Sequence, residues 1–274
     1  MKHNNQVGKV ILAGAGPGDP ELLTLKACRY LGQADVVITD RLVSQTILND
    51  YVRKDALILQ VGKQGRGAQS TPQALINELL IEYAQQNKLV VRLKGGDVAI
   101  FSNLLDELQA LTAKGIPYEI IPGITAASGA AAYTGIPLTA RGHAIAVRLL
   151  TYYKKDLLNT QHWADLAATD DTLVFYMSSG TLEELVAALL AHGISQDKYI
   201  AVIEQATTPE QRTISCRLHQ YHALFGNNAY ASPTLIIIGR VAGLHEQFQW
   251  IPELRSPINY FNPVAKPLES EARA

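Results

Sequence analysis

The residues Arg92-Leu93-Lys94-Gly95-Gly96-Asp97 combine two glycines with cationic and anionic side chains. They follow the apolar run Leu89-Val90-Val91, so the glycines and the Asp97 carboxylate stand where a buried strand is expected to end. In an open α/β sheet, ligands bind at that edge. Glycine lets the backbone approach a ligand closely, and Asp97 supplies an anionic acceptor. Gly-Gly-Asp is also common in an ordinary strand-to-helix turn, so the hexapeptide alone leaves both interpretations open.

Four other apolar runs of the first half also end in glycine, proline or charged residues. They are Val10–Ala13 before Gly14–Pro20, Val36–Thr39 before Asp40 and Arg41, Leu57–Val61 before Gly62 and Lys63, and Tyr118–Ile121 before Pro122–Thr125. Short β-branched runs are typical of strands buried on both faces of a parallel sheet. Because parallel strands end at one edge, we expect Asp40, Lys63 and Asp97 to gather there.

Helical patterns with recognisable starts lie between these runs. Asp19-Pro20 predicts an N-cap and a first helical position, and Thr71-Pro72 repeats that signature. A third helix is expected over residues 102–114, ending before Gly115. The alternation of strands and helices predicts βα units and a mainly parallel sheet.

The sequence changes in texture after Pro122-Gly123, which predicts a domain junction. The run of small residues at 125–132 suits a helix packed closely against either another helix or a ligand. Four further strands are expected at 144–150, 172–176, 199–203 and 233–238, with an amphipathic helix at 182–192. We therefore expect α/β domains at 8–122 and 123–246. An extended tail with four prolines is expected at 247–274.

Composition argues against several classes of protein. The 274 residues are 47% hydrophobic and 18% charged, which is typical of a soluble protein with a sizeable core. A net charge of −1 without a basic stripe disfavours nucleic acid as a partner. There is no signal-peptide pattern and no apolar run near eighteen residues, so we expect a cytoplasmic protein without a membrane span. Cys28 and Cys216 lack metal-ligand spacing, so neither a metal site nor a disulfide is expected.

The glycine loop at residues 14–18 departs from a dinucleotide-binding fingerprint. That fingerprint is G-x-G-x-x-G, and Asp19 stands where the third glycine is required. A carboxylate there would repel a pyrophosphate, so a neutral or cationic ligand is expected. No Ser-His-Asp order, His-Glu-x-x-His or Cys-x-x-Cys is present. The histidines are scattered, and His143, in the turn at 139–143, is the one retained as a candidate.

Seven blocks of the sequence are similar to motifs of one family, in the same order. They are residues 14–26, 40–44, 61–63, 92–97, 122–133, 135–139 and 174–177. Together they closely resemble the uroporphyrinogen-III C-methyltransferases of the tetrapyrrole methylase family, over about residues 8–250. The resemblance implies a class III methyltransferase fold, with two α/β domains and a cleft between them, usually as a homodimer.

The same resemblance implies a reaction. S-adenosylmethionine would be the methyl donor and S-adenosylhomocysteine its product. Carbons 2 and 7 of uroporphyrinogen III would be methylated in turn to give precorrin-2, which feeds sirohaem, cobalamin or haem d1 routes. Methyl transfer from a sulfonium needs in-line positioning and a dry pocket more than strong acid–base chemistry.

Site residues follow from the resemblance position by position. The donor set is Pro17, Gly95, Gly96, Asp97, Ile100, Thr125, Ala126, Met177 and Ala206, the last where the family usually has glycine. Asp40 and Lys63 match the positions assigned to proton transfer, for which one carboxylate suffices. The alternative for Asp40 is that it caps the following turn with Ser44. Candidate partners for the eight substrate carboxylates are Arg41, Lys63, Arg66, Lys94, Arg141 and Arg148.

The departures from the family pattern fall on the presumed tetrapyrrole side. Asn103 replaces an arginine, Asp106 a glutamate and Tyr153 a histidine, and the loop at 64–70 lacks a further histidine. Two alternatives therefore stay open. One is a methylase of the same fold acting on another precorrin, and the other is a catalytically degenerate module that binds S-adenosylmethionine. The retained Asp40 and Lys63 favour the active enzyme.

Overall fold

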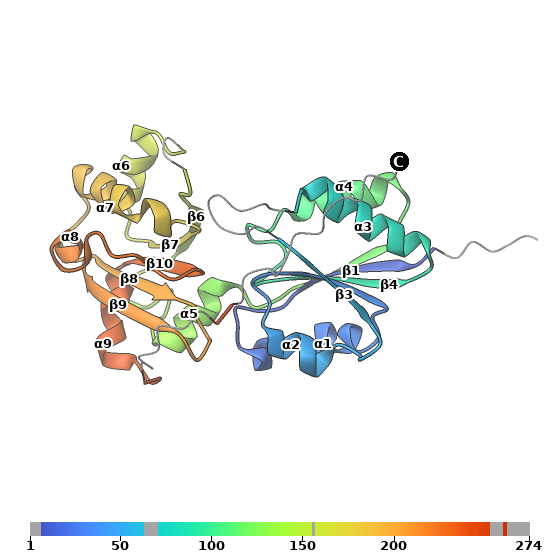
Figure 1. Cartoon of the computed structure of the whole chain (residues 1–274). Helices are drawn as coiled ribbons and strands as arrows, with labels where there is room; N and C mark the ends of the chain where they lie inside the picture. Colours follow the sequence, from blue (N-terminus) through green and yellow to red (C-terminus); the bar gives the residue numbers. More distant parts are fainter. Residues whose placement is uncertain (1–6, 63–70, 155–156, 253–259, 262–274) are drawn as a thin grey trace, which may run out of the picture. The chain divides into compact units, whose positions relative to one another are not determined.

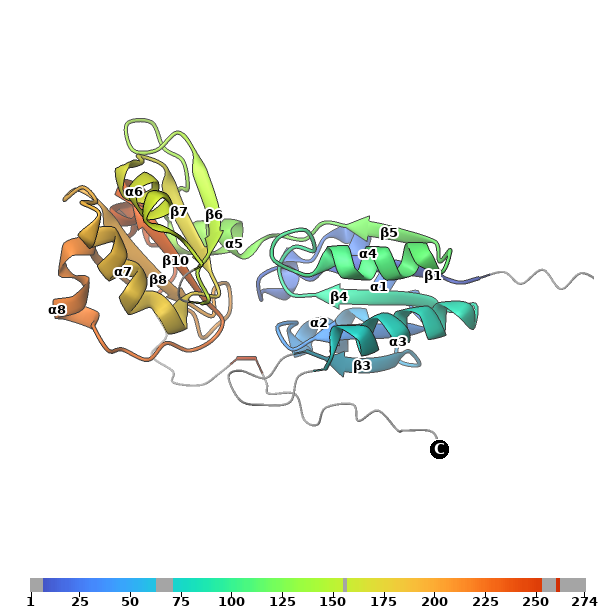
Figure 2. The same cartoon turned by 90° about the horizontal axis from the view of Figure 1, so that it is seen from above.

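The computed structural model describes residues 7–62, 71–154, 157–252 and 260–261. These residues form two compact units. The first reaches to Thr125 and takes in Phe261, and the second runs from Ala126 to Tyr260. Each unit is built on a five-stranded sheet, and Figures 1 and 2 show helices packed on both faces of each sheet. The expected α/β class with two α/β domains is confirmed, while the domain bounds at 122 and 246 stay predictions.

The sheet of the first unit is wholly parallel. Its strands are β1 (Lys9–Gly14), β2 (Val36–Asp40), β3 (Leu57–Val61), β4 (Leu89–Lys94) and β5 (Tyr118–Ile121). Their order is β3-β2-β4-β1-β5, and every neighbouring pair is parallel. All five expected strands are confirmed. Their carboxyl ends share one edge of the sheet, which is where the sequence concentrates its glycines and charges.

Burial on both faces, expected for all five strands, holds only for the middle of the sheet. β1, β2 and β4 are buried almost throughout. β3 and β5 are the edge strands, and Leu57, Ile58, Tyr118 and Ile120 are between 39% and 44% exposed. The expectation was wrong for β3 and β5 because an edge strand has a neighbour on one side only. An apolar run in the sequence does not reveal that position.

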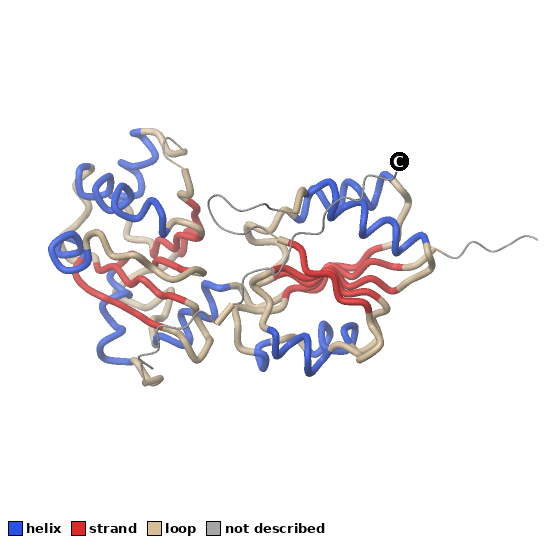
Figure 3. The backbone as a smooth tube through the Cα atoms, in the orientation of Figure 1, coloured by secondary structure: helices blue, strands red, loops and turns tan. Residues whose placement is uncertain are grey.

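Helices cover both faces of this sheet (Figure 3). They are α1 (Leu25–Leu31), α2 (Gln45–Tyr51), α3 (Gln73–Gln85) and α4 (Leu104–Ala113). α1 and α2 pack on one face, and α3 and α4 on the other. The helices expected from Thr71-Pro72 and over 102–114 are confirmed within two residues, whereas α2 was not predicted.

The first helix begins later than the Asp19-Pro20 signature predicts. The Asp19 carboxylate accepts a hydrogen bond from the Glu21 N–H, but the turn it caps is only the 3-10 segment η1 (Pro20–Leu22). The α-helix starts after Thr24, whose hydroxyl accepts a hydrogen bond from the Ala27 N–H. Two capping residues in succession therefore start two short helices where one was expected.

The second unit contains a mixed sheet. Its strands are β6 (Val147–Thr151), β7 (Thr172–Tyr176), β8 (Tyr199–Glu204), β9 (Arg212–Arg217) and β10 (Thr234–Gly239). Their order is β6-β7-β10-β8-β9; β6 and β7 are parallel, and the other neighbouring pairs are antiparallel. The four expected strands are confirmed. β9 was missed because its sequence, Arg-Thr-Ile-Ser-Cys-Arg, is largely polar, as suits an edge strand.

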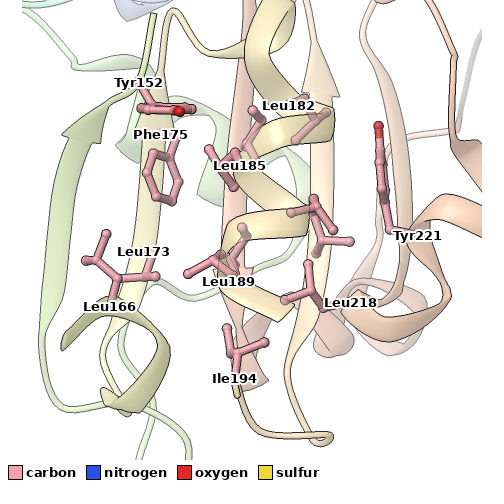
Figure 4. Close-up of a cluster of buried hydrophobic side chains, with 14 of the residues drawn as sticks. Tyr152, Leu166, Leu173, Phe175, Leu182, Leu185, Leu189, Ile194, Leu218 and Tyr221 are labelled. Carbon is pink, nitrogen blue, oxygen red and sulfur yellow. The ribbon is translucent and has the colours of Figure 1, made fainter. Parts of the chain in front are cut away.

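Helices of the second unit pack on opposite faces of this sheet. They are α5 (Ala126–Thr134), α6 (Thr160–Ala168), α7 (Leu182–Ala191), α8 (Tyr221–Phe225) and α9 (His245–Phe248), with 3-10 segments η2 (Ser179–Thr181), η3 (Leu218–Gln220) and η4 (Arg240–Leu244). On one face Leu182, Leu185 and Leu189 of α7 share an apolar cluster with Leu173 and Phe175 of β7 (Figure 4). α9 shows that helix continues into the first residues of the expected extended tail.

The small-residue helix, α5, packs on the other face of the second sheet. Ala127 and Ala130 are almost fully buried in one apolar cluster with Val174, Ile203 and Ile237 of the strands. The close neighbour of this helix in the cluster is therefore a sheet, where the sequence had left another helix or a ligand as alternatives. Small side chains let the helix backbone approach the strands closely.

Two kinds of feature are absent from the described residues. None of their helices has the length and apolar character needed to cross a membrane. No cluster of histidine, cysteine, aspartate or glutamate suited to a metal ion occurs among them. Cys28 and Cys216 are both free thiols.

Candidate functional site

The loop after β4 is held against its neighbours by direct backbone contacts. The N–H of Gly96 donates to the Gly16 carbonyl (2.7 Å), and the Gly16 N–H donates back to the Gly96 carbonyl (3.1 Å). A Cβ on Gly14 would lie 2.6 Å from the Gly96 oxygen and 2.7 Å from the Gly123 Cα. Gly14, Gly96 and Gly123 thus meet backbone to backbone, which side chains would prevent. Gly95 is equally confined, since a Cβ there would lie 2.8 Å from the Leu42 Cβ.

Asp97 ties this loop to the segment after β5. Its Oδ1 accepts a hydrogen bond from the Ala99 N–H (2.8 Å), and its Oδ2 accepts one from the Gly123 N–H (2.9 Å). Both oxygens therefore shape the loops at the carboxyl edge of the sheet. A carboxylate has about four acceptor positions, so these two bonds leave capacity for a ligand donor.

Asp40, at the carboxyl end of β2, is paired with a buried arginine. Nη2 of Arg92 donates to Oδ1 of Asp40 at 2.5 Å. Arg92 is 3% exposed, and its Nε donates to Oε1 of Glu107 at 3.0 Å. Lys94 Nζ donates to the other oxygen, Oε2 of Glu107, at 2.9 Å. We refer to Asp40, Arg92, Lys94 and Glu107 as the buried charge cluster.

Burial and charge act in opposite directions on the cations of this cluster. Desolvation is the largest influence on both Arg92 and Lys94, and it disfavours their charged forms. For Arg92, the attraction of Asp40 and Glu107 outweighs desolvation and raises the pKa above its ordinary value. For Lys94, desolvation and repulsion by Arg92 outweigh the attraction of Glu107, so its pKa is lowered. The cluster therefore holds two cations of unequal acidity around one fully buried carboxylate.

This geometry revises two expectations from the sequence. Asp40 does not cap the turn with Ser44; its carboxylate accepts from Arg92, and α2 has no side-chain cap bond from Ser44. Lys94 is 2% exposed and paired with Glu107, so the expectation that it meets substrate carboxylates was wrong. Lys63, the second proton-transfer candidate, lies outside the described residues. No contact can therefore be assigned between it and Asp40.

The remaining donor candidates of the first unit surround the same loops. Pro17 is buried in the turn after β1, and Ile100 and Thr125 are partly buried. Phe101 and Asn103, just before α4, both have positive φ (52° and 55°). Non-glycine residues with positive φ are uncommon and gather at functional sites. The backbone between Asp97 and α4 is therefore held in an uncommon conformation at two of its residues.

Two donor candidates of the second unit, Ala126 and Ala206, belong to one apolar cluster on the α5 face of its sheet, and the third, Met177, follows a residue that packs on it. Ala126 packs against that cluster, Ala206 is one of its buried members, and Tyr176, which precedes Met177, packs against it as well. The Tyr176 hydroxyl oxygen accepts a hydrogen bond from the Ala127 N–H at 3.0 Å, in the first turn of α5. Met177 itself is 54% exposed with φ 54°. Its thioether is thus presented at the surface by a left-handed backbone.

Ala206 lies in a tightly bonded loop after β8. The flanking residues Gln205 and Thr207 have positive φ (48° and 67°), while Ala206 itself is 7% exposed. Oε1 of Gln211 accepts a hydrogen bond from the Thr207 N–H (2.8 Å), and its Nε2 donates to the Tyr133 carbonyl of α5 (3.5 Å). Gln211 thereby ties the loop to α5, a role that sequence reasoning did not assign.

The other cationic candidates differ in whether their side chains are exposed and unpaired enough to meet the substrate carboxylates. Arg148 is paired with Asp165 and Asp171, whereas Arg141 is exposed and Arg41 partly so. Arg66 lies outside the described residues. The substituted family positions, Asn103, Asp106 and Tyr153, are all exposed. In His143, Nδ1 lies 3.2 Å from the Arg141 carbonyl, so the ring helps to close its own turn.

Arg92 and Glu107 were not recognised from the sequence as site residues, although a signal was present. Arg92 and Lys94 alternate with Leu93 in a strand, so they share one face of the sheet. Glu107 falls on the apolar face of α4, between Leu104 and Leu111. A carboxylate on a buried helix face opposite two cations on a buried strand predicts an ion-pair cluster.

Comparison with known proteins identifies the relatives of this chain. Residues 9–221 match the family model for tetrapyrrole (corrin/porphyrin) methylases. A siroheme synthase of Acinetobacter baylyi is 49% identical over 244 residues, which cover 89% of this chain and 53% of the relative. The chain thus spans about half the length of the curated relatives it matches.

Solved structures of a shorter protein match nearly end to end. Uroporphyrin-III C-methyltransferase of Thermus thermophilus superposes with a TM-score of 0.73 at 34% identity, covering 89% of this chain and 98% of that one. A structure of the Thermus thermophilus enzyme complexed with S-adenyl homocysteine gives a TM-score of 0.71 at 34% identity, covering 85% and 93%.

Proposed function

The chain belongs to the tetrapyrrole (corrin/porphyrin) methylase family, and from that premise we propose that it methylates uroporphyrinogen III at carbons 2 and 7, giving precorrin-2. The observation that carries the proposal is the match over almost the whole length of the Thermus methyltransferase. The higher identity to a siroheme synthase over most of this chain supports the same substrate.

We propose S-adenosylmethionine as the donor, held by the set Pro17, Gly95, Gly96, Asp97, Ile100, Thr125, Ala126, Met177 and Ala206. The relative that was solved with S-adenyl homocysteine supports this choice. When bound, S-adenosylmethionine supplies an electrophilic methyl group. Two of the residues suit such a ligand directly: Asp97 retains acceptor capacity, and the exposed Met177 offers an apolar contact.

In this proposal Asp40 accepts the proton that leaves the methylated macrocycle. Its carboxylate has one oxygen held by Arg92, and its side chain is 26% exposed, so it is both oriented and accessible. A positioned carboxylate base of this kind accelerates proton transfer by about a hundredfold or more. Lys63 is assigned to the same step by resemblance alone. Arg41 and Arg141 are the described cations that remain candidates for the substrate carboxylates.

Two other functions are distinguished by one experiment. Purified chain is incubated with S-adenosylmethionine and enzymatically generated uroporphyrinogen III, and the product mass is measured. Two added methyl groups support the proposal. No methylation of uroporphyrinogen III, but methylation of a later precorrin, favours a different methylase of this fold. Calorimetric binding of S-adenosylhomocysteine without any methylation favours a donor-binding module.

A further inference from the structure

The buried charge cluster constrains the Asp40 carboxylate through one side chain. Arg92 holds Oδ1 at 2.5 Å, and no described residue donates a hydrogen bond to Oδ2. The orientation of Asp40 therefore depends on where the Arg92 guanidinium is fixed. Oδ2 is left as the oxygen available to accept a proton.

The Arg92 guanidinium is in turn fixed by every one of its nitrogens. Nη1 donates to the carbonyls of Ile38 and Leu93, each at 3.3 Å, and Nε donates to Glu107 at 3.0 Å. A guanidinium is a rigid planar fork, so anchoring Nε and Nη1 determines where Nη2 points. Glu107 supplies the only charged anchor among these partners other than Asp40 itself.

Glu107 is fully buried, and both of its oxygens are occupied, by Arg92 and by Lys94. It comes from α4, whereas Arg92 and Lys94 come from β4 and Asp40 from β2. We propose that Glu107 is a positioning residue that acts through Arg92 to orient Asp40 for proton transfer. This inference rests on the proposed function, because it concerns the same reaction.

The net charge of the buried charge cluster gives the inference a testable direction. Among the described residues, Arg92 and Lys94 of β4 interact electrostatically with Asp40, and Glu107 of α4 pairs with both of these cations. With all members ionised, the cluster holds two positive and two negative groups. Glu107→Gln leaves it with one excess positive charge and favours the ionised Asp40. Lys94→Met leaves one excess negative charge and disfavours it.

The test compares four proteins by the pH dependence of kcat/KM and by donor affinity. In Glu107→Gln we expect the acidic limb of the pH profile to move to lower pH, and in Lys94→Met to higher pH. In the double variant it should return toward the wild-type position.

We expect kcat of Glu107→Gln to fall on the order of tenfold, the scale seen when partners that orient metal ligands are removed. S-adenosylhomocysteine affinity should stay unchanged. Glu78→Gln, the same substitution at an exposed position of α3, is the matched control.

A second measurement does not depend on turnover. The side-chain carboxyl carbon of Asp40, assigned in labelled protein by comparison with Asp40→Asn, is titrated in each variant by NMR. Opposite displacements in the two single variants support the inference. If the Asp40 titration moves in the same direction in both single variants, or does not move, the inference is overturned even when the wild type is an active methyltransferase. If one single variant fails to fold, the other must still move in its own expected direction and the double variant must return toward the wild-type value; failure of either overturns the inference. An inactive wild type overturns the proposed function and leaves this titration as the test of the geometry.

Discussion

Oδ2 of Asp97 accepts a hydrogen bond from the N–H of Gly123, a residue 26 positions later in the chain, at 2.9 Å. Asp97→Asn replaces one acceptor oxygen with a donor group, so either this bond or the one to Ala99 is lost. We expect about 1.5–3 kcal/mol of destabilisation, the range for hydrogen bonds to charged groups. We also expect weaker binding of S-adenosylhomocysteine. Urea unfolding and calorimetry measure the two effects.

Asp106→Asn is the matched control for that prediction, because Asp106 is exposed on α4. Its substitution should change stability by less than about 1 kcal/mol. Equal effects at both positions would show that the Asp97 bonds contribute nothing particular to the fold.

Gly14→Ala should destabilise the first unit strongly, by about 1–3 kcal/mol or more. The added Cβ would meet the backbone of Gly96 and Gly123 at 2.6–2.7 Å, and backbone atoms cannot swing aside. Gly32→Ala is the control, since its Cβ would have ordinary contacts of 3.7 Å or more. Thermal unfolding distinguishes the two; a neutral Gly14→Ala would mean that the three-glycine contact is looser than described.

Gly96→Val should abolish donor binding in calorimetry, but the structure adds a second effect. Gly96 has φ 70° and exchanges two backbone hydrogen bonds with Gly16, so valine also strains the loop. Unfolding must therefore be measured beside binding. A stable Gly96→Val that binds S-adenosylhomocysteine normally would remove Gly96 from the donor set.

Asp40→Asn should lower turnover by about a hundredfold or more, because it removes the proposed base while keeping its shape. Donor affinity should be nearly unchanged. Asp55→Asn, at an exposed aspartate paired with Arg53, controls for loss of an ion pair on the same unit. Normal turnover in Asp40→Asn would end this assignment and direct attention to Asp106 or Tyr153.

Glu119 on β5 should titrate well below an ordinary glutamate. Hydrogen bonds from Lys26, Lys9 and Tyr30 lower its pKa from 4.5 to about 2. Because the folded-state value lies below the unfolded one, the ionised form stabilises the fold above about pH 4.5. That contribution is lost as the pH falls toward 2.

Two measurements check the Glu119 prediction. NMR titration of the wild type gives the pKa directly. Unfolding of wild type and Glu119→Gln should differ most near neutral pH and converge on acidification. A difference that grows toward low pH would contradict the assigned sign.

We also propose that the chain is a homodimer, on the family resemblance alone. Light scattering over a dilution series measures this directly. The small residues of α5 no longer support the proposal, because Ala127 and Ala130 are buried within their own unit. A clean monomer at micromolar concentration would count against it.

The sequence predicted the strands well because their apolar runs are short, β-branched and bounded by glycine or charge. Of the ten strands in the described part of the chain, nine were expected, and β9 was not, since its polar residues resemble a loop. Relative position within a sheet was less predictable. Nothing in Leu57-Ile58-Leu59 distinguishes an edge strand from a central one, because that depends on which strands pair.

The site was predictable in its location but not in its interactions. Parallel topology brings Asp40 and Asp97 to one edge, as expected. The sequence could not show that Arg92 would take Asp40 as a partner, because their contact joins residues 52 positions apart. It also assigned the glycines to a ligand, whereas the backbone of neighbouring loops occupies much of the space beside them.

The exposed edge strands bear on how the protein behaves at high concentration. A sheet edge is a template to which a further strand can add. β5 is only four residues long and carries Glu119 beside two lysines, features that discourage such addition. β3 has Leu57 and Ile58 exposed and no charged residue along its length. Of the two edges of the first sheet, β3 is therefore the one at which strand addition should start on storage or heating, and Ile58→Lys is the substitution that should delay it.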